Sequence, residues 1–290
     1  DLLPDHFSFV QGIVDTPDVS LNISREMLQH DRQLKVIANN IEKKIKSELV
    51  KLMKDDREKY QQFWTAFGMQ FKYALMNAYG QNRDTIRDLL LFWSSKENKL
   101  TSLKEYVDRM PESQEKIYYV CADSVEHASK MPQAERVLKA GYEVLYLTVD
   151  EDEIVLQMLE NAYDKPFVSV ASEDALPVTD AEKASVEQAE KDHKALLDFA
   201  QETLKGEVSK VRISKILQSG AVCLTAEGPV SLEMEKYFRK MRRDFPMSAQ
   251  RVLELNPDAP AFQALCKAYE EDKEKAAAYV EVLYNQALII

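Results

Sequence analysis

Apolar side chains recur at steps of three and four residues over much of the chain, which is the spacing of one face of an α-helix. The longest such stripe runs from Leu34 to Leu52, and residues 24–54 contain neither proline nor glycine. This pattern predicts one long helix. Two further stripes predict helices after it, namely Tyr60, Phe63, Trp64, Phe67 and Phe71, and then Ile86, Leu89, Leu90 and Trp93. Because aromatic stripes are typical of buried cores, we predict a small helical bundle here.

Runs rich in β-branched and aromatic residues predict strands in the middle of the chain. Residues 116–121 and 142–147 are two such runs, and residues 125–139 between them have a helical pattern that Gly141 closes. A strand, a helix and a strand in about 30 residues make a βαβ unit with a parallel strand pair. A helix at 154–159 and a strand at 166–170 are predicted to follow. Without a glycine-rich first turn, this module is predicted to be structural or an interaction surface.

The composition becomes acidic and alanine-rich at residues 172–190, which we interpret as a linker and domain boundary. Beyond it we predict a helix that ends at Gly206, two paired strands at 208–217 and 221–225, and helices at 261–268 and 276–290. The predicted fold class is therefore a mixed α and β protein of several domains. It has a long helix and helical bundle, a small βαβ module, and an α+β C-terminal domain.

The segment that opens the long helix contains the first candidate site. Asn22 and Ser24 can cap the first turn, and Glu26 suits the positive end of the helix dipole. Arg25 does not, because a cation there costs roughly 0.3–1 kcal/mol when no anion is near. Gln29 lies one turn later on the same face. Arg25 and Gln29 could therefore bind a phosphate oxygen at the helix start, or Arg25 could form an ordinary surface ion pair.

A second unusual element is the helical pattern at residues 231–244, which Pro246 terminates. Its apolar face consists of Met234, Tyr237, Phe238 and Met241, and its cations are Lys236, Arg239, Lys240, Arg242 and Arg243. Such a helix can bind a partner or a membrane surface, or it can simply pack its apolar side as a surface helix. Methionine and aromatic side chains together suit adaptable binding.

Composition argues against several classes of function. A net charge of −11 disfavours general nucleic-acid binding, and no signal peptide or long apolar span indicates a membrane protein. The chain has only seven glycines and contains neither a GxxxxGK[ST] nor a GxGxxG motif, so no phosphate-cradling loop is predicted. Its three cysteines are far apart and its four histidines are scattered, which predicts neither a disulfide framework nor a metal site. A reducing compartment fits this cysteine usage.

Several blocks of the sequence resemble one family. Phe9-Val10-Gln11-Gly12-Ile13-Val14-Asp15-Thr16-Pro17-Asp18-Val19-Ser20, followed by Leu21-Asn22-Ile23-Ser24-Arg25-Glu26-Met27-Leu28-Gln29, resembles a middle-domain signature of the heat-shock protein 90 chaperones, which have a bacterial branch. Residues 100–110 and 114–119 resemble the next block of that family. Residues 253–257 and 283–288 resemble two blocks of its C-terminal domain. Because the chain begins without methionine inside such a block, we expect it to be a fragment that lacks an N-terminal part.

The resemblance implies a role in an ATP-dependent molecular chaperone. In that family an arginine in this position reaches the γ-phosphate of ATP, so the implied catalytic residues are Arg25, Asn22 and Gln29. ATP and Mg²⁺ would be bound by a separate N-terminal ATPase domain and not by this chain. On its own, the chain is therefore expected neither to bind ATP tightly nor to hydrolyse it. A cytoplasmic location is also implied.

Two kinds of protein partner are implied as well. Unfolded or partly folded client proteins would contact Met234, Tyr237, Phe238, Met241, Glu153 and Ile154, although an isoleucine here replaces the aromatic residue of some bacterial members. A second copy of the full-length protein would form a homodimer through Val280, Leu283, Tyr284, Ala287 and Leu288. The truncated chain is expected to be largely monomeric, because the helix that would complete this bundle is absent.

The implied domain organisation has four parts. Residues 1–54 would end the large middle subdomain and carry the catalytic loop, residues 55–114 would be a helical connector, residues 115–171 a small α/β subdomain, and residues 172–290 a truncated C-terminal domain. The competing hypothesis is a non-catalytic scaffold that binds partners while Arg25 forms only an ion pair. An independent enzyme lacks support, because no nucleophile, metal cluster or cofactor loop is recognisable.

Overall fold

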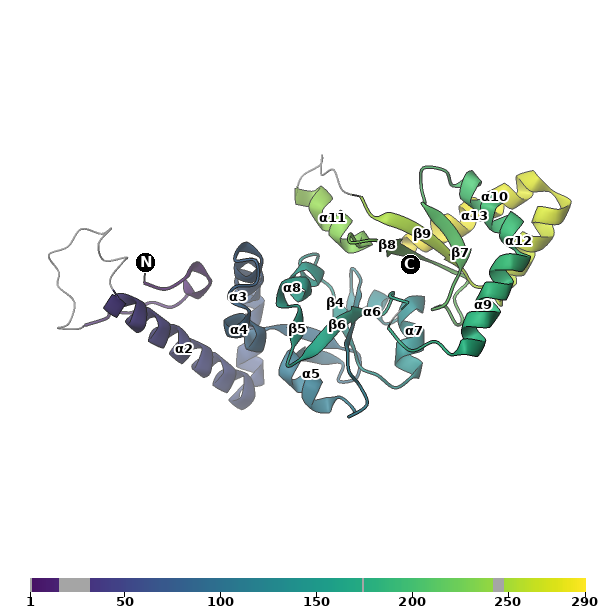
Figure 1. The fold of residues 1–290 in the computed structure, drawn as a ribbon. Coiled ribbons are helices and arrows are strands. Elements are labelled where there is room, and N and C mark those ends of the chain that lie inside the picture. Colours follow the sequence, from purple (N-terminus) through teal and green to yellow (C-terminus); the bar gives the residue numbers. More distant parts are fainter. Residues whose placement is uncertain (1, 16–31, 174, 242–247) are drawn as a thin grey trace.

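The structure is a computed structural model that describes residues 2–15, 32–173, 175–241 and 248–290. Within these residues a pair of helices is followed by a sheet with helices on both faces, and then by a second sheet with its own helices (Figure 1). This arrangement confirms the predicted fold class of mixed α and β structure.

The predicted long helix and the aromatic helix are both present among the described residues. After a short 3₁₀ turn, η1 (Asp5–Phe7), the chain forms α2 (Arg32–Asp55) and α3 (Arg57–Asn77). They are separated by Asp56, whose carboxylate accepts a hydrogen bond from the backbone N–H of Lys59 at 3.0 Å and so caps α3. The aromatic stripe is core, as predicted, with Tyr60 and Phe71 completely buried.

The prediction of a helix that includes Trp93 was wrong. Helical structure is limited to α4 (Arg83–Ile86) and η2 (Arg87–Leu89), and the chain then forms a hairpin of strands β1 (Leu91–Ser94) and β2 (Lys99–Ser102). This hairpin lies in the range expected to be a helical connector. An unbroken apolar run such as residues 89–93 fits a buried strand as well as a helix, so spacing alone could not separate the two.

The hairpin joins a six-stranded sheet among the described residues, in the order β2-β1-β4-β3-β6-β5. The remaining strands are β3 (Ile117–Cys121), β4 (Val144–Leu147), β5 (Asn161–Ala162) and β6 (Lys165–Ser169). Strand β3 is parallel to both β4 and β6, which confirms the predicted parallel pair of a βαβ unit. Strands β1 and β5 run antiparallel at the two sides of this parallel centre.

The helix predicted at 125–139 is divided into α6 (Val125–Ala128) and α7 (Pro132–Lys139). Pro132 explains the break, because proline is tolerated in the first turn of a helix but not inside one. The last helix of this part, α8 (Asp152–Leu159), is present as predicted. Gly141 follows α7 with φ +84°, a conformation that favours glycine at a helix end.

The side chains of β3 point alternately to the two faces of the sheet, and each face packs against its own core. Ile117 and Tyr119 face the core shared with α2, α3 and α8, whereas Tyr118 and Val120 face the core covered by α6 and α7. The carboxyl ends of β3 and β4 therefore lie close to α8 and to the loop that precedes it. This edge of the sheet positions the candidate site described below.

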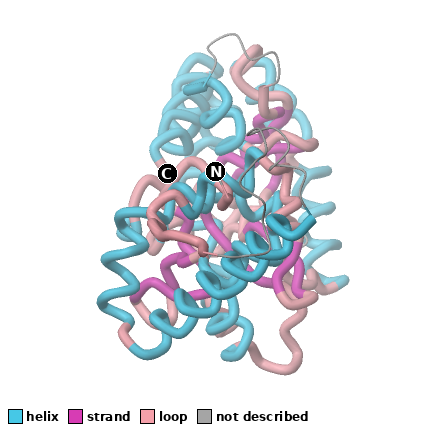
Figure 2. The backbone as a smooth tube through the Cα atoms, turned by 90° about the vertical axis from the view of Figure 1, so that its left-hand side faces the viewer, coloured by secondary structure: helices cyan, strands magenta, loops and turns pink. Residues whose placement is uncertain are grey.

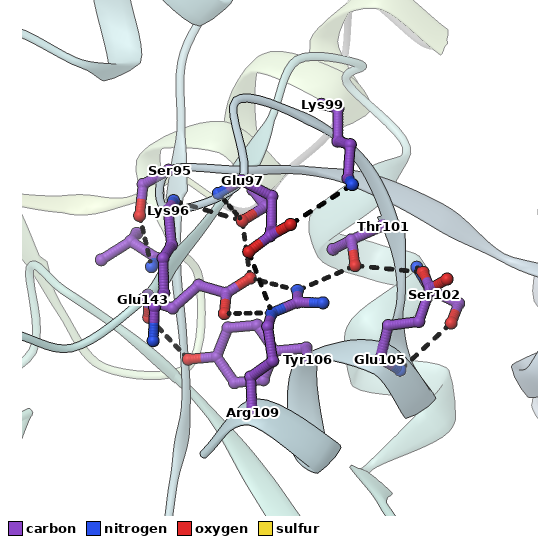
Figure 3. A network of polar contacts seen from close by, with 12 residues as sticks. Ser95, Lys96, Glu97, Lys99, Thr101, Ser102, Glu105, Tyr106, Arg109 and Glu143 are labelled. Atoms are coloured by element: carbon purple, nitrogen blue, oxygen red, sulfur yellow. Dashed lines mark hydrogen bonds and ion pairs between the residues drawn. The ribbon is translucent and has the colours of Figure 1, made fainter. Parts of the chain in front are cut away.

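At the opposite end of β4, a network of polar contacts ties the hairpin to the rest of the sheet (Figure 3). The Glu143 carboxylate accepts hydrogen bonds from Ser94 Oγ at 2.6 Å and from Arg109 Nη2 at 2.6 Å. Arg109 belongs to α5 (Leu103–Arg109), which begins with a capping box formed by Ser102 and Glu105. The buried Tyr106 hydroxyl also donates to the Glu143 carbonyl at 2.6 Å.

Residues 180–190 of the segment expected to be a linker are helical. Helix α9 (Asp180–Asp192) begins at a capping box of Thr179 and Glu182. An Ala-rich and acidic composition is compatible with a solvated helix once a cap is present, so composition alone did not indicate α9. None of the α9 residues is fully buried. Helix α10 (Lys194–Thr203) follows and ends close to Gly206, as predicted.

The second sheet contains three described strands, β7 (Lys210–Ile213), β8 (Val222–Glu227) and β9 (Gln250–Leu255), in the order β7-β9-β8. The prediction that the first two pair with each other was wrong. Strand β9 lies between them, parallel to β7 and antiparallel to β8. Arg212 of β7 and Glu254 of β9 bind each other across the sheet, with Arg212 Nη2 and Glu254 Oε1 2.6 Å apart.

The final helices are α12 (Pro260–Glu271) and α13 (Lys273–Ile289), as the sequence predicts. Together with α10 they cover the second sheet and enclose a core that includes Phe262, Leu265 and Val280. Figure 2 shows the strands running through the molecule with helices around them. Helix α11 (Leu232–Met241) belongs to this part of the chain but lies against α8 of the preceding part (Figure 1).

Candidate functional site

The phosphate-site residues predicted from the sequence, Asn22, Arg25 and Gln29, lie outside the described residues. The first predicted site that the structure describes is therefore the amphipathic helix α11. Its start is defined by Ser231, whose Oγ accepts a hydrogen bond from the backbone N–H of Met234 at 3.1 Å. A short oxygen-bearing side chain in this position is the usual N-cap of a helix.

The apolar face of α11 is buried to different extents along its length. Tyr237 is 7% exposed, Met234 and Phe238 are half-buried, and Met241 is 71% exposed. The Tyr237 and Phe238 rings also pack edge to face with centroids 5.5 Å apart. The face therefore continues from a packed contact to an apolar side chain at the surface.

The other two residues assigned to this site, Glu153 and Ile154, lie in the first turn of α8 and are 6% and 7% exposed. The Glu153 carboxylate accepts a hydrogen bond from Tyr119 Oη of β3 at 3.1 Å and another from Ser231 Oγ. Burial raises the pKa of the Glu153 carboxyl, while these two hydrogen bonds oppose the rise. Glu153 thus connects the sheet, α8 and the start of α11.

The structure brings the α8 and α11 residues together. Gln157 of α8 contacts Met234 of α11, with Nε2 and Sδ 3.0 Å apart. Lys236 Nζ lies 2.6 Å from the Asp123 carboxylate after β3, and Lys240 pairs with Asp150 before α8. Helix α11 is therefore bound to α8 and to the segments that follow β3 and precede α8.

These ion pairs change the expected charge of the surface. Lys236, Arg239 and Lys240 pair with Asp123, Glu235 and Asp150, respectively. Arg242 and Arg243 lie outside the described residues. The described cations of this helix thus already have acidic partners within the chain.

Carboxylates are concentrated at this contact, and their pKa values shift in opposite directions. Burial raises the pKa of Glu233, Lys236 opposes that rise, and the charges of Glu153, Asp123 and Asp150 add to it. The hydrogen bond and charge of Lys236 lower the pKa of Asp123. Charge at the contact is therefore sensitive to pH.

A cavity of about 930 Å³ opens beside the contact. It lies between the edge of the first sheet, α11 and the second sheet, and its walls include Cys121, Glu153, Leu224, Lys236 and Arg251. The lining mixes apolar and charged groups, which suits a polypeptide segment better than a purely apolar ligand. Three of these charged residues also hold α11 in place, namely Glu153, Lys236 and Arg251.

The residues predicted for dimerisation lie on α13. Val280, Leu283, Tyr284 and Ala287 are buried in the core of this chain, where they pack beneath the second sheet. Leu288 is 52% exposed. The exposed apolar residues at this end of the helix also include Val282 and Ile289.

Sequence reasoning missed the residues that hold the contact together, namely Ser231, Asp123, Asp150 and Gln157. Ser231 carried a recognisable signal, because a serine directly before an apolar helical pattern predicts an N-cap. The acidic run Asp150-Glu151-Asp152-Glu153 was visible too, but its partners lie far away in sequence. Among the described residues, no group of three His, Cys, Asp or Glu side chains could hold a metal ion. No described helix is long and apolar enough to span a membrane.

Known proteins resemble this chain along its entire length. The family model described as Hsp90 protein matches residues 1–290. The chain is 53% identical to chaperone protein HtpG of Bacillus subtilis (strain 168) over 290 residues, and 51% identical to chaperone protein HtpG of Oceanobacillus iheyensis over 290 residues. It is 49% identical to chaperone protein HtpG of Clostridium perfringens (strain ATCC 13124) over 290 residues. Each match covers 100% of this chain and 46% of the relative, so the chain spans about half the length of these relatives. By the family match over all its residues, the chain belongs to the Hsp90 protein family.

Proposed function

We propose that this chain is the middle and C-terminal part of an ATP-dependent molecular chaperone that binds unfolded or partly folded client proteins. Membership of the Hsp90 family and the name of its HtpG relatives support this proposal. The cytoplasm and a homodimeric full-length protein belong to the same proposal. No nucleic acid or membrane partner is needed for it.

The observation that supports client binding most directly is the position of α11. Its apolar face contains methionine and aromatic side chains, and it ends at the surface with Met241 71% exposed. Methionine is flexible and polarizable, so such a face can adapt to dissimilar apolar sequences. The cavity of about 930 Å³ next to α11 provides room for an extended segment. In this proposal Glu153 supplies part of the cavity wall, and Ile154 beside it is a candidate client contact that is not among the residues lining the cavity.

Replacing Met241 by Asp tests the client site at its exposed end. We expect weaker suppression of aggregation when a chemically denatured model protein is diluted into solution with this chain. The melting temperature should hardly change, because exposed substitutions usually alter stability within about ±0.5 kcal/mol. Val36→Asp is the matched control, since Val36 is also an exposed apolar residue, 53% exposed, but lies on α2.

Equal suppression by Met241→Asp, Val36→Asp and the unmodified chain would contradict the proposed client site. Phe238→Ala provides a second test, because Phe238 is half-buried on the same face. If Phe238→Ala melts well below the unmodified chain, we assign Phe238 to the core, where such a truncation costs roughly 3–5 kcal/mol.

ATP dependence is proposed for the longer protein. A separate N-terminal domain would bind ATP and Mg²⁺. Arg25, with Asn22 and Gln29 beside it, would stabilise charge on the γ-phosphate. In the longer protein, Arg25→Ala should lower ATP turnover with little change in melting temperature. Arg32→Ala at the start of α2 is the control. Full turnover in Arg25→Ala would favour the non-catalytic scaffold.

A further inference from the structure

Four consecutive carboxylates at the start of α8 are shared between two helices that are distant in sequence. Glu151 and Asp152 contact α3, where Glu151 accepts a hydrogen bond from Tyr73 Oη at 3.1 Å and Asp152 pairs with Lys72 at 2.6 Å. Asp150 and Glu153 contact α11 and its cap, through Lys240 and Ser231. Glu151 also faces α11, because burial and then the charge of Glu151 raise the pKa of Tyr237. We name residues 150–153 the acidic turn.

The α3 side of the acidic turn is a buried ion pair. The side chains of Lys72 and Asp152 are 5% and 4% exposed, and Lys72 Nζ also lies over the Trp64 and Phe92 rings, 5.6 Å and 5.9 Å from their centroids. Burial raises the pKa of Asp152, although Lys72 opposes the rise. A buried charge that loses its partner is strongly destabilised, so the acidic turn must follow α3 when α3 moves.

The α11 side depends on the same turn of helix. Glu153 accepts a hydrogen bond from Ser231 Oγ, and Ser231 Oγ in turn accepts one from the Met234 N–H. The N-cap of α11 is therefore fixed by a residue adjacent to Asp152 in sequence. Lys240, near the other end of α11, is held by Asp150.

We propose that the acidic turn couples α3 to α11, so that displacement of one helix loosens the other. The physical basis is that Asp152, which contacts α3, and Glu153, which contacts the cap of α11, are neighbours on the rigid backbone of one short helix. A shift of one contact therefore displaces the other. The coupling acts through hydrogen bonds and ion pairs that are either formed or broken, which is the two-state behaviour that transmission between sites requires.

In the longer chaperone, α3 follows α2, which comes after the Arg25 segment in the sequence, and α11 carries the client face. The acidic turn would thus relay between nucleotide and client, a role that rests on the proposed function. The coupling itself is a property of this chain and can be measured without nucleotide or client. Its failure and the failure of the proposed function are therefore distinguishable.

Amide hydrogen exchange of α11 in Lys72→Met tests the coupling in the 290-residue chain. We expect exchange at residues 232–241 to accelerate by roughly threefold to tenfold, the size typical of coupling through a shared network. Lys59→Met is the matched control, because Lys59 is exposed on the same helix. Exchange in α12 serves as an internal reference for global unfolding. Equal α11 exchange in Lys72→Met and Lys59→Met overturns the proposal.

A milder pair of variants decides the question if Lys72→Met also accelerates exchange in α12. Tyr73→Phe removes only the hydroxyl that binds Glu151, and Tyr73 is 45% exposed. Tyr79→Phe removes a hydroxyl from a side chain that is 82% exposed near the end of α3. Faster α11 exchange in Tyr73→Phe than in Tyr79→Phe supports the coupling, and equal exchange overturns it.

A double-mutant cycle gives an independent test. Tyr73→Phe and Ser231→Ala break contacts on opposite sides of the acidic turn, and their effects on α11 exchange should be smaller together than the product of the two separate effects. Coupling also requires the reciprocal result, faster exchange in the second half of α3 when Ser231 is changed to Ala. Strictly multiplicative effects would show that the two contacts act independently and would overturn the proposal.

Discussion

The two ends of strand β4 carry acidic residues that are used in different ways. At the amino end, the carboxylate of Glu143 is held by Ser94 of β1 and Arg109 of α5, and all three residues belong to one sheet and its helix. At the carboxyl end, the acidic turn divides its four carboxylates between α3 and α11. The contacts of Glu143 stay within one sheet and its helix, whereas the contacts of the acidic turn join separate parts of the chain.

This difference matters because identical chemistry has different consequences in the two places. In the Glu143 cluster every named partner belongs to the same sheet or to α5 beside it (Figure 3). In the acidic turn the partners belong to separate parts of the chain, so movement of one part strains the bonds, and the cost of breaking them is largest for the buried Asp152 and Glu153. Polar contacts therefore stabilise the fold at one end of β4 and make an adjustable junction at the other.

The largest expected effect is the loss of the Glu143 pair. Arg109→Met should lower the free energy of unfolding by roughly 3 kcal/mol, because it leaves a carboxylate that is 6% exposed without its cation. Urea denaturation measures this change. The matched control is Arg83→Met, whose ion pair with Glu160 is equally short at 2.6 Å but has side chains 38% and 65% exposed. It should cost at most about 1 kcal/mol. Equal losses would mean that burial does not distinguish the two pairs.

Local patterns predicted most of the elements that surround β4. Helices α2 and α3 followed from apolar spacing, and β3, β4 and β6 followed from their strand-forming residues, because both signals are contained in the segment itself. Strand β1 was missed for a related reason. The run Leu89 to Trp93 has no polar interruption that would distinguish a period of two from a period of 3.6.

Long-range pairing could not be predicted in the same way. Strand β9 lies between β7 and β8. Residues 208–225 contain no signal that a strand beginning at Gln250 will pair with both of them. The same limit applies to the candidate site. The apolar face of α11 was visible in the sequence, but the partners of Lys236 and Lys240 lie 113 and 90 residues away. The sequence therefore indicated a binding surface without showing that its lysines pair with carboxylates of the same chain.

An intermediate effect is expected at the cap of α11. Ser231→Ala should destabilise α11 locally by about 1 kcal/mol, the usual value for a lost N-cap, and it should also remove one of the two hydrogen bonds to Glu153. Ser124→Ala is the matched control, because Ser124 caps α6 through the His127 N–H at 3.1 Å and is exposed. Hydrogen exchange of the two helices measures both effects. A smaller loss for Ser231 than for Ser124 would contradict the importance of the Glu153 contact.

The smallest expected effect is a dependence of α11 docking on pH. Glu153 faces Tyr119 of β3 and Ser231 of α11, with Glu233, Lys236, Asp152 and Cys121 nearby. Burial raises the pKa of Glu153 above its ordinary 4.5, so its ionised form opposes docking. This opposition disappears as the pH falls through the raised pKa, and docking should tighten.

Asp123 limits this gain at lower pH. Lys236 lowers the pKa of Asp123 from the ordinary 3.8. The stabilising ion pair of Asp123 is therefore lost only when the pH falls through this lowered pKa. Docking should therefore be tightest between the lowered pKa of Asp123 and the raised pKa of Glu153, and weaker at neutral pH. Protection of α11 relative to α12, measured between pH 4.5 and 8, tests this, and Glu153→Gln should flatten the profile. An unchanged profile in Glu153→Gln would assign the pH dependence to Glu233, whose pKa is also raised by burial.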